Sequence, residues 1–213
     1  MEILTFIFLI AIALFTMVIH EVSHGMAAYF LGDPTAKLAG RLTLNPLKHL
    51  DPIGSILLPG ILILLQGIFG RGIVIGWAKP VPVNPFNLKD PKYGMAKVAA
   101  VGPGVNFLLA FLFSFFIRIL PKDTVFFKNL TLFFGYIVWL NLLWAIFNLF
   151  PVPPFDGWHI FSALFPSLKE KEATLYANSF FLILIVILLM VWFVIPLIIV
   201  PLFDILTGLR FPI

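Results

Sequence analysis

The chain has 213 residues, 61% of them hydrophobic and 11% charged, with a mean hydropathy of +1.08. Most segments are too apolar to face water, so the composition excludes an ordinary soluble domain and predicts a polytopic membrane protein. The net charge is +4, but the 14 Lys and Arg residues cluster between apolar runs, as in membrane-flanking loops, and no nucleic-acid-binding motif is present. Cysteine is absent, so any metal must be held by His, Asp or Glu.

The first apolar run extends from Ile3 to about Leu31. It is longer than the roughly 20 helical residues that cross a bilayer. Gly32, Asp33 and Pro34 end the predicted helix, and the polar, basic stretch that follows, residues 35–52, is predicted to be a loop at one membrane face.

Two segments after this loop are not predicted to be ordinary spans. Residues 53–69 are apolar but only about 17 residues long, with Pro59 and Gly60 near the centre, which predicts a re-entrant or broken segment. Residues 70–93 contain "GWAKPVPVNPFNLKDP", in which alternating Pro and Val exclude a helix. We expect a short extended or β element there, at the cytoplasmic face.

Further apolar runs follow at Met95 to Leu120, at Phe126 to Phe150 and, after a polar break and a short amphipathic stretch, at Ala177 to Leu206. The sequence therefore predicts an all-α polytopic membrane protein with about 4–6 membrane segments. We expect a single domain over residues 1–213, with a core in residues 3–170. Residues 177–206 are expected to form a C-terminal membrane segment, either one kinked span or a hairpin.

The basic residues predict how the chain is oriented. If residues 3–31, 97–119 and 130–150 cross the membrane, the eight Lys and Arg residues between positions 37 and 97 lie on one side, against Arg118, Lys122 and Lys128 on the other. By the positive-inside rule, the first side is cytoplasmic. The first span and the 130–150 span then end at the same face, whereas a full crossing by residues 53–69 would separate them.

The first span carries the polar pattern HExxH near its end, as His20-Glu21-Val22-Ser23-His24. Two histidines four residues apart share one helix face and can bind a single ion, with Glu21 beside them. A charge at membrane depth costs at least ~2.5–3.5 kcal/mol and persists mainly where function or pairing compensates. An ion pair with Glu21 is the alternative, but no apolar run offers Lys or Arg at that depth. The pattern predicts a zinc site with Glu21 as general base.

A third protein ligand is expected from a short set of candidates: Asp156, His159, His49 and Asp204. Asp156 is favoured, because the prolines of "NLFPVPPFDGWH" keep the chain extended at the membrane edge and Gly157 allows close backbone approach. The alternative for Asp156 is an N-cap of a helix that begins at Trp158. We expect His159 to form local hydrogen bonds or face the membrane interface. His49 is expected to be solvated in its basic loop, and Asp204 is expected to pair with Arg210.

Four motifs occur in order: "HEVSH" at 20–24, "GWAKPVPVNP" at 76–85, "GPGVN" at 102–106 and "NLFPVPPFDG" at 148–157. Together they resemble the site-2 protease family of intramembrane zinc metalloproteases, over about residues 3–170. The resemblance implies one Zn²⁺ per chain, with His20, His24 and Asp156 as ligands and Glu21 as the catalytic acid/base. It also implies that Asn148 holds the substrate backbone or the developing oxyanion, for which a helix C-cap is the alternative.

Asn106 is expected to pack and form hydrogen bonds between helices. We expect a compact member of the family, without extra soluble domains.

The function expected from these features is hydrolysis of a peptide bond within or near a transmembrane helix of a membrane-protein substrate. The protein is expected in the lipid bilayer of a prokaryotic inner membrane, with its active site near the cytoplasmic face. The Pro-Val segment from Trp77 to Pro85 is a candidate edge for pairing with an unwound substrate. Two alternatives remain: a catalytically inactive zinc-binding partner, which would be expected to lose Glu21 or a ligand, and a metal transporter, which would usually carry several ligand sets.

Overall fold

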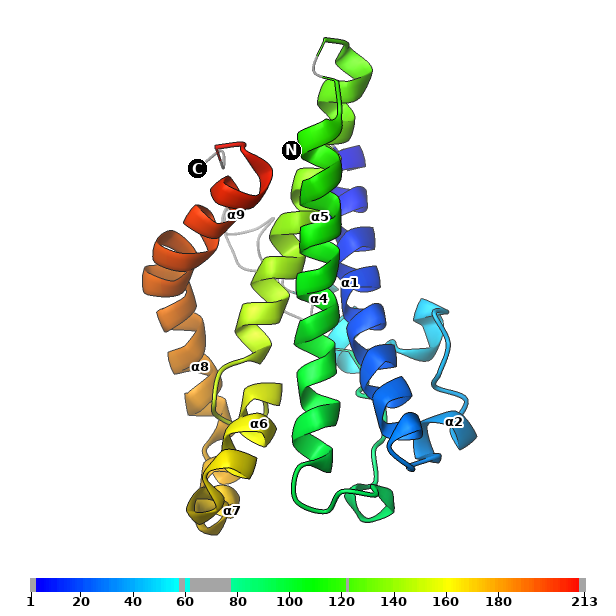
Figure 1. The fold of residues 1–213 in the computed structure, drawn as a ribbon, viewed down its shortest axis with the longest axis vertical. Coiled ribbons are helices and arrows are strands. Elements are labelled where there is room, and N and C mark those ends of the chain that lie inside the picture. The colour runs from blue at the N-terminus through cyan, green and yellow to red at the C-terminus, as the bar shows by residue number, and fades with distance from the viewer. Residues whose placement is uncertain (1–2, 58–59, 62–77, 122, 211–213) are drawn as a thin grey trace.

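The structure is a computed structural model that describes residues 3–57, 60–61, 78–121 and 123–210. Four helical stretches in this part of the chain are long and apolar enough to cross a membrane. They are α1 (Ile3–Phe30), α4 (Gly94–Ile119), α5 (Val125–Asn148) and a continuous stretch of α8 (Ser179–Leu189), π-helical η5 (Met190–Ile199) and α9 (Val200–Thr207). In Figure 1, α1, α4 and α5 lie side by side, and the α8-to-α9 stretch lies on the far side of α5 from α1.

Short helices connect these spans. They are α2 (Thr35–Leu38), η1 (Pro46–Lys48), π-helical η2 (Pro52–Leu57), η3 (Pro85–Asn87), α6 (Asp156–Leu164), η4 (Pro166–Lys171) and α7 (Glu172–Ala177). Local sequence explains where several helices begin and end. Gly32 adopts a φ of +108° just after α1, a conformation that favours glycine. At the start of α5, the Thr124 hydroxyl accepts a hydrogen bond from the Phe127 amide.

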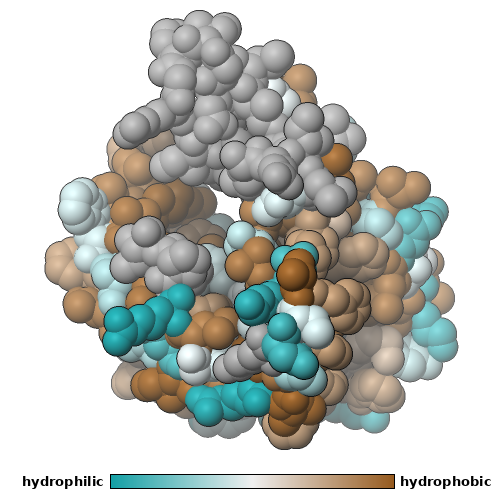
Figure 2. Space-filling model, turned by 90° about the horizontal axis from the view of Figure 1, so that it is seen from above, coloured by the Kyte–Doolittle hydropathy of each residue, from teal (hydrophilic) through white to brown (hydrophobic). Residues whose placement is uncertain are grey.

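The spans bury little of their length inside the protein, as expected for helices that contact lipid. In the most apolar window of each span, between 17% and 33% of the residues are buried. Large side chains such as Leu108 and Phe115 of α4 are 63% and 59% exposed. Seen from above (Figure 2), hydrophobic residues make up much of the visible described surface, and hydrophilic residues gather in separate groups. The main apolar core lies between α4, α5 and the last span.

The predicted spans agree with the observed ones to within a few residues at each end, and residues 179–207 form one span and no hairpin. Most of the predicted re-entrant segment, 53–69, lies outside the described residues. The expected extended element is not confirmed. Residues 78–84 contain no strand, and their only regular pairing in the described chain is an isolated antiparallel bridge between Leu50 and Ala78.

The fold brings four chain segments to one end of the molecule. The C-terminal part of α1, the N-terminal part of α4, the end of α5 and α6 all lie in the lower half of Figure 1. The Lys89 amide donates to the Leu31 carbonyl at 2.9 Å, so the segment that precedes α4 is bonded to the end of α1. Residues far apart in the sequence can therefore meet at this end.

Candidate metal centre

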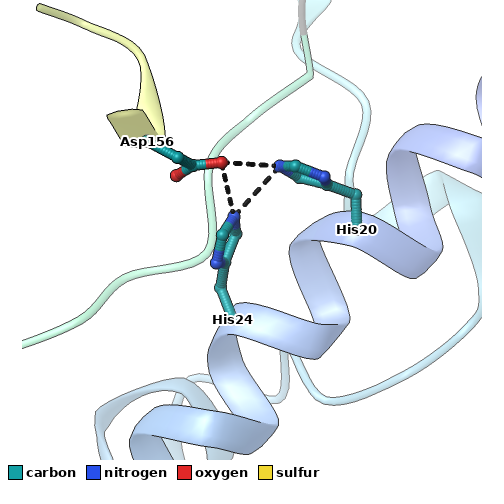
Figure 3. A group of neighbouring side chains, drawn as sticks. All are labelled: His20, His24 and Asp156. Carbon is teal, nitrogen blue, oxygen red and sulfur yellow. Dashed lines mark hydrogen bonds and ion pairs between the residues drawn. The ribbon is translucent and has the colours of Figure 1, made fainter. Parts of the chain in front are cut away.

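His20 and His24 of α1 meet Asp156, the first residue of α6, inside this end of the bundle. The Oδ2 atom of Asp156 lies 3.0 Å from His20 Nε2 and 3.3 Å from His24 Nε2, and the two Nε2 atoms are 3.0 Å apart. Figure 3 shows the three side chains pointing at one another, with the histidines on successive turns of α1. Both histidines are buried, at 3% and 8% exposed. Within the described residues, these three form the group that could hold a metal ion.

Each imidazole is held by its other ring nitrogen. His24 Nδ1 lies 2.8 Å from the carbonyl oxygen of Val98, and His20 Nδ1 lies 2.7 Å from Asn106 Oδ1. A carbonyl oxygen can only accept a hydrogen bond, so both Nδ1 atoms carry the proton that they donate. In the neutral rings, both Nε2 atoms are therefore left with a lone pair directed toward Asp156.

Three acceptor atoms thus face one another at close range. One of these atoms is a carboxylate oxygen, and the other two are ring nitrogens whose protons sit on the far side of each imidazole. Such a group requires positive charge at its centre. Ligand atoms about 2.0–2.2 Å from a zinc ion at tetrahedral angles lie about 3.3–3.6 Å apart, only a few tenths of an ångström more than the observed separations. The donor set and its geometry therefore fit zinc.

Glu21 lies beside the cluster and is fixed by the backbone of another segment. Its Oε2 accepts a hydrogen bond from the Val81 amide at 2.8 Å. Glu21 and the three clustered side chains line a cavity of about 310 Å³. The other residues of its wall come from the 80–83 segment, α4, the end of α5 and the region of α6: Pro80, Val81, Val83, Met95, Val98, Ala99, Asn148, Pro154 and His159. The cavity therefore adjoins both Glu21 and the cluster.

Two glycines make the close approach of the elements possible. A Cβ atom on Gly102 of α4 would lie 2.4 Å from Cε1 of His24 and 2.7 Å from Cε1 of His20. A Cβ atom on Gly157 would lie 2.2 Å from the Leu149 carbonyl oxygen, as the predicted close backbone approach requires. Any side chain at Gly102 would therefore displace the imidazoles, and any at Gly157 would displace the segment that carries Asp156.

The alternative uses of Asp156 and Asn148 as helix caps do not occur. Phe155 is the N-cap residue of α6, and Leu149 is the C-cap residue of α5. Asn148 is the last residue of α5, its Nδ2 donates to the Trp144 carbonyl at 2.9 Å, and its side chain lines the cavity. Both residues are thus placed beside the cavity.

The other ligand candidates differ in position. His159 lines the cavity wall without belonging to the cluster, and burial lowers the pKa of its imidazole, so the ring is neutral at pH 7. The prediction that His49 is solvated is wrong: the residue is 0% exposed, and its Nε2 donates to the Thr43 carbonyl at 2.8 Å. Asp204 lies in α9, at the opposite end of the molecule from the cluster (Figure 1).

Sequence reasoning did not identify all residues connected to the cluster. It predicted hydrogen bonding for Asn106 but not its bond to His20, and it did not consider Thr16 or Asn141, which continue the same hydrogen-bonded chain. The available signal was their polarity within otherwise apolar spans. Partner identity could not be predicted, because it depends on how α1, α4 and α5 pack.

The fold and the cluster define a membrane protein whose HExxH helix carries a candidate metal site, and comparisons with known proteins place it among zinc proteases. The model of peptidase family M50 matches residues 116–192. YwhC of Bacillus subtilis (strain 168), which is named as a zinc metalloprotease, is 39% identical over 195 residues, covering 87% of this chain and 82% of its own. Rip2 of Mycolicibacterium smegmatis, also named as a zinc metalloprotease, is 31% identical over 189 residues, covering 86% and 67%. No solved structure matches the chain.

The chain therefore belongs to peptidase family M50, the site-2 protease family. It is an integral membrane zinc metalloprotease, and the function predicted from its motifs is confirmed at this level. The match to zinc metalloproteases also agrees with the donor set formed by His20, His24 and Asp156.

Proposed function

We propose that His20, His24 and Asp156 bind one zinc ion per chain and that Glu21 is the catalytic acid/base of peptide-bond hydrolysis. The observation that carries this proposal is the convergence of three acceptor atoms that lie 3.0 to 3.3 Å apart. Two of them belong to His20 and His24, four positions apart on α1, and the third belongs to Asp156 of α6, at least 132 positions further along the chain. Without a cation, such a group is electrostatically unfavourable. When bound, zinc would polarise the scissile carbonyl and acidify a water molecule.

Glu21 performs the proton transfers in this scheme. The Val81 amide holds Oε2, so we assign proton transfer to Oε1, which takes the proton of the attacking water and passes it to the leaving amine nitrogen. The Val81 amide keeps the carboxylate beside the cavity. Asn148, on the cavity wall, has a second amide hydrogen besides the one given to Trp144, and we assign it to the substrate carbonyl.

The substrate in this proposal is a transmembrane helix of another protein, cleaved within or near the membrane. A helical substrate hides its carbonyl groups in its own hydrogen bonds, so it must unwind before attack. Residues 78–84 offer an edge for the unwound chain, because Arg41 Nη2 donates to the Lys79 carbonyl at 2.7 Å and the Asn84 amide donates to Asp33 Oδ2 at 2.7 Å, which fixes the segment at both ends. Pro80, Val81 and Val83 of this segment line the cavity.

We propose a cytoplasmic location for the site, in a prokaryotic inner membrane. Lys37, Lys89 and Lys97 lie beside the ends of α1 and α4 that carry the site, whereas Arg118 and Lys128 lie at the other ends of α4 and α5. The positive-inside rule favours the cytoplasm for the first group.

We also propose that residues 53–69 are re-entrant. The end of α1 and the start of α4 lie at the same end of the bundle, so the intervening chain leaves and returns at one membrane face, which a single crossing cannot achieve. The whole of residues 1–213 is then one membrane protease domain.

The test is cleavage in proteoliposomes that contain the purified protein and single-span membrane proteins tagged at both ends. We expect wild type to release membrane-depth fragments and Glu21→Gln to slow cleavage by about 10²- to 10⁴-fold. The amide oxygen of the substituted glutamine can still accept from Val81, so zinc content should stay at that of wild type. Full activity in Glu21→Gln would refute the role of Glu21 as acid/base.

A further inference from the structure

A chain of buried polar side chains extends from His20 across three spans. It consists of Thr16 on α1, Asn106 on α4 and Asn141 on α5, which are 4%, 1% and 1% exposed. None of them is among the residues that line the cavity. Polar side chains inside apolar spans are costly and usually serve function or helix association. Their hydrogen bonds therefore call for an explanation.

The direction of each hydrogen bond follows from one backbone carbonyl. The side-chain amide of Asn141 lies 2.9 Å from the carbonyl oxygen of Ile137, which can only accept, so the Asn141 atom that faces it must be Nδ2. Nδ2 also lies 3.3 Å from Thr16 Oγ1, which accepts its second hydrogen. Asn141 Oδ1 is thereby directed toward α4.

The same logic continues to the metal centre. Asn141 Oδ1 can only accept, so the Asn106 atom 3.0 Å from it must be Nδ2. The other amide atom of Asn106, Oδ1, then faces His20 Nδ1 at 2.7 Å and accepts its proton. His20 is left with an Nε2 lone pair directed at Asp156 and His24. If the Asn106 amide were rotated by 180°, its NH₂ group would face Nδ1 and favour the wrong tautomer.

We propose that Asn141, supported by Thr16, is a positioning residue for the metal centre that acts on His20 through the amide of Asn106. The inference rests on the proposed function, because it takes His20 as a zinc ligand. Outer partners that orient a metal-binding histidine typically change metal affinity by about 10- to 100-fold when they are removed. Asn141 is one residue further out than such a partner, and it acts by fixing which end of the Asn106 amide faces the ring.

The competing explanation is that Asn141 only holds α4 and α5 together. The two explanations differ in a double-mutant cycle on the zinc dissociation constant, measured by competition with a chromophoric chelator in detergent. We expect Asn141→Leu to weaken zinc binding about 10-fold and Asn106→Leu about 10- to 100-fold. The Asn106→Leu/Asn141→Leu double variant should bind zinc no more weakly than Asn106→Leu alone, because residues in one chain of contacts are not additive. Additive losses would overturn the proposal.

A conservative variant supplies a second measurement. In Asn141→Asp, a carboxyl group in this apolar setting stays protonated, so its carbonyl oxygen can accept from Asn106 and its hydroxyl can donate to Ile137. We expect Asn141→Asp to bind zinc within about threefold of wild type. A loss as large as that of Asn141→Leu would contradict the proposed direction of the hydrogen bonds.

Thr16→Val keeps the proposal testable if Asn141→Leu does not fold. It removes one long hydrogen bond, and we expect an affinity loss of about two- to fivefold. Its matched control is Ser114→Ala, because Ser114 is a buried hydroxyl of α4 that donates to the Ala110 carbonyl and has no bond to this chain. Ser114→Ala should leave zinc affinity unchanged. Wild type without zinc would refute the proposed function itself, whereas zinc-binding wild type with no loss in Thr16→Val and Asn141→Leu would refute only this inference.

Discussion

Two carboxylates near the end of α1, Asp33, which is fully buried, and Asp156, which is partly buried, have opposite surroundings. Asp33 is 0% exposed and is surrounded by donors: its Oδ1 accepts from the Thr35 amide at 3.1 Å, the Thr35 hydroxyl at 2.5 Å and Asn87 Nδ2 at 2.8 Å, and its Oδ2 accepts from the Asn84 amide at 2.7 Å. Asp156 faces two ring nitrogens, each left with a lone pair because the other nitrogen of its ring donates elsewhere.

The difference separates a structural carboxylate, Asp33, from the proposed metal ligand, Asp156. The charge of Asp33 is balanced by donors of the protein itself, so it links the end of α1 to the 84–87 segment and needs no ligand. The charge of Asp156 is not balanced in this way, so its site calls for a cation. The two residues have the same side chain and lie near the same end of α1, but the atoms around each carboxylate distinguish them.

The largest effect is expected from closing the space at the metal centre. In Gly102→Ala, the new methyl group would collide with both imidazoles, and we expect zinc affinity to fall by at least about 100-fold. Gly104→Ala is the matched control, because a Cβ atom at Gly104 meets nothing within 4 Å. Equal zinc dissociation constants for the two variants, measured by chelator competition, would contradict the observed packing of α4 on α1.

A smaller effect, on stability alone, is expected at the structural carboxylate. Asp33→Ala leaves several donors without their acceptor and should lower the free energy of unfolding by about 2 kcal/mol. Zinc content should remain at that of wild type, because Asp33 is not part of the cluster. Thermal unfolding in detergent and metal analysis of the same sample measure both quantities. Loss of zinc without loss of stability would reverse the roles assigned to the two carboxylates.

The smallest effect is the acid dependence of the Asp33 contribution. Burial opposes ionisation of Asp33, but the hydrogen bonds from Thr35, Asn87 and Asn84 outweigh it and lower the pKa of its carboxyl below the usual 3.8. A carboxyl with a lowered pKa stabilises the folded state fully above its unfolded pKa and loses that contribution as the pH falls through the folded pKa. The stability difference between wild type and Asp33→Ala should therefore be constant at neutral pH and shrink below about pH 3.8. A difference that grows in acid would contradict this assignment.

The sequence predicted the parts of the site that depend on local spacing. His20 and His24 share a helix face because they are four residues apart, and polar residues in an apolar span are conspicuous. The motif resemblance implied Asp156 as the third ligand, and the structure brings it beside the two histidines, although it is 132 positions away from His24 in the sequence. The features that could not be predicted depend on packing. They are the close contact of Gly102 with the two imidazoles, the burial of His49, and the hydrogen-bonded chain through Asn106 and Asn141.

The fold was predictable to the same extent. Long apolar runs gave the four spans, because hydrophobic length is a property of the sequence alone. The alternation of Pro and Val excluded a helix but did not produce a strand in residues 78–84. These residues are held by separate hydrogen bonds, including those from Arg41 to the Lys79 carbonyl and from Val81 to Glu21. Prolines lack the amide donor that a regular ladder needs.

The most direct test of the account is the zinc content of the purified protein, wild type compared with Asp156→Ala and with Asp33→Ala as the matched carboxylate control. The account predicts about one zinc ion per chain in wild type and in Asp33→Ala, and little or none in Asp156→Ala. Equal zinc in all three proteins, or none in wild type after expression in zinc-replete medium, would contradict the three-ligand metal centre.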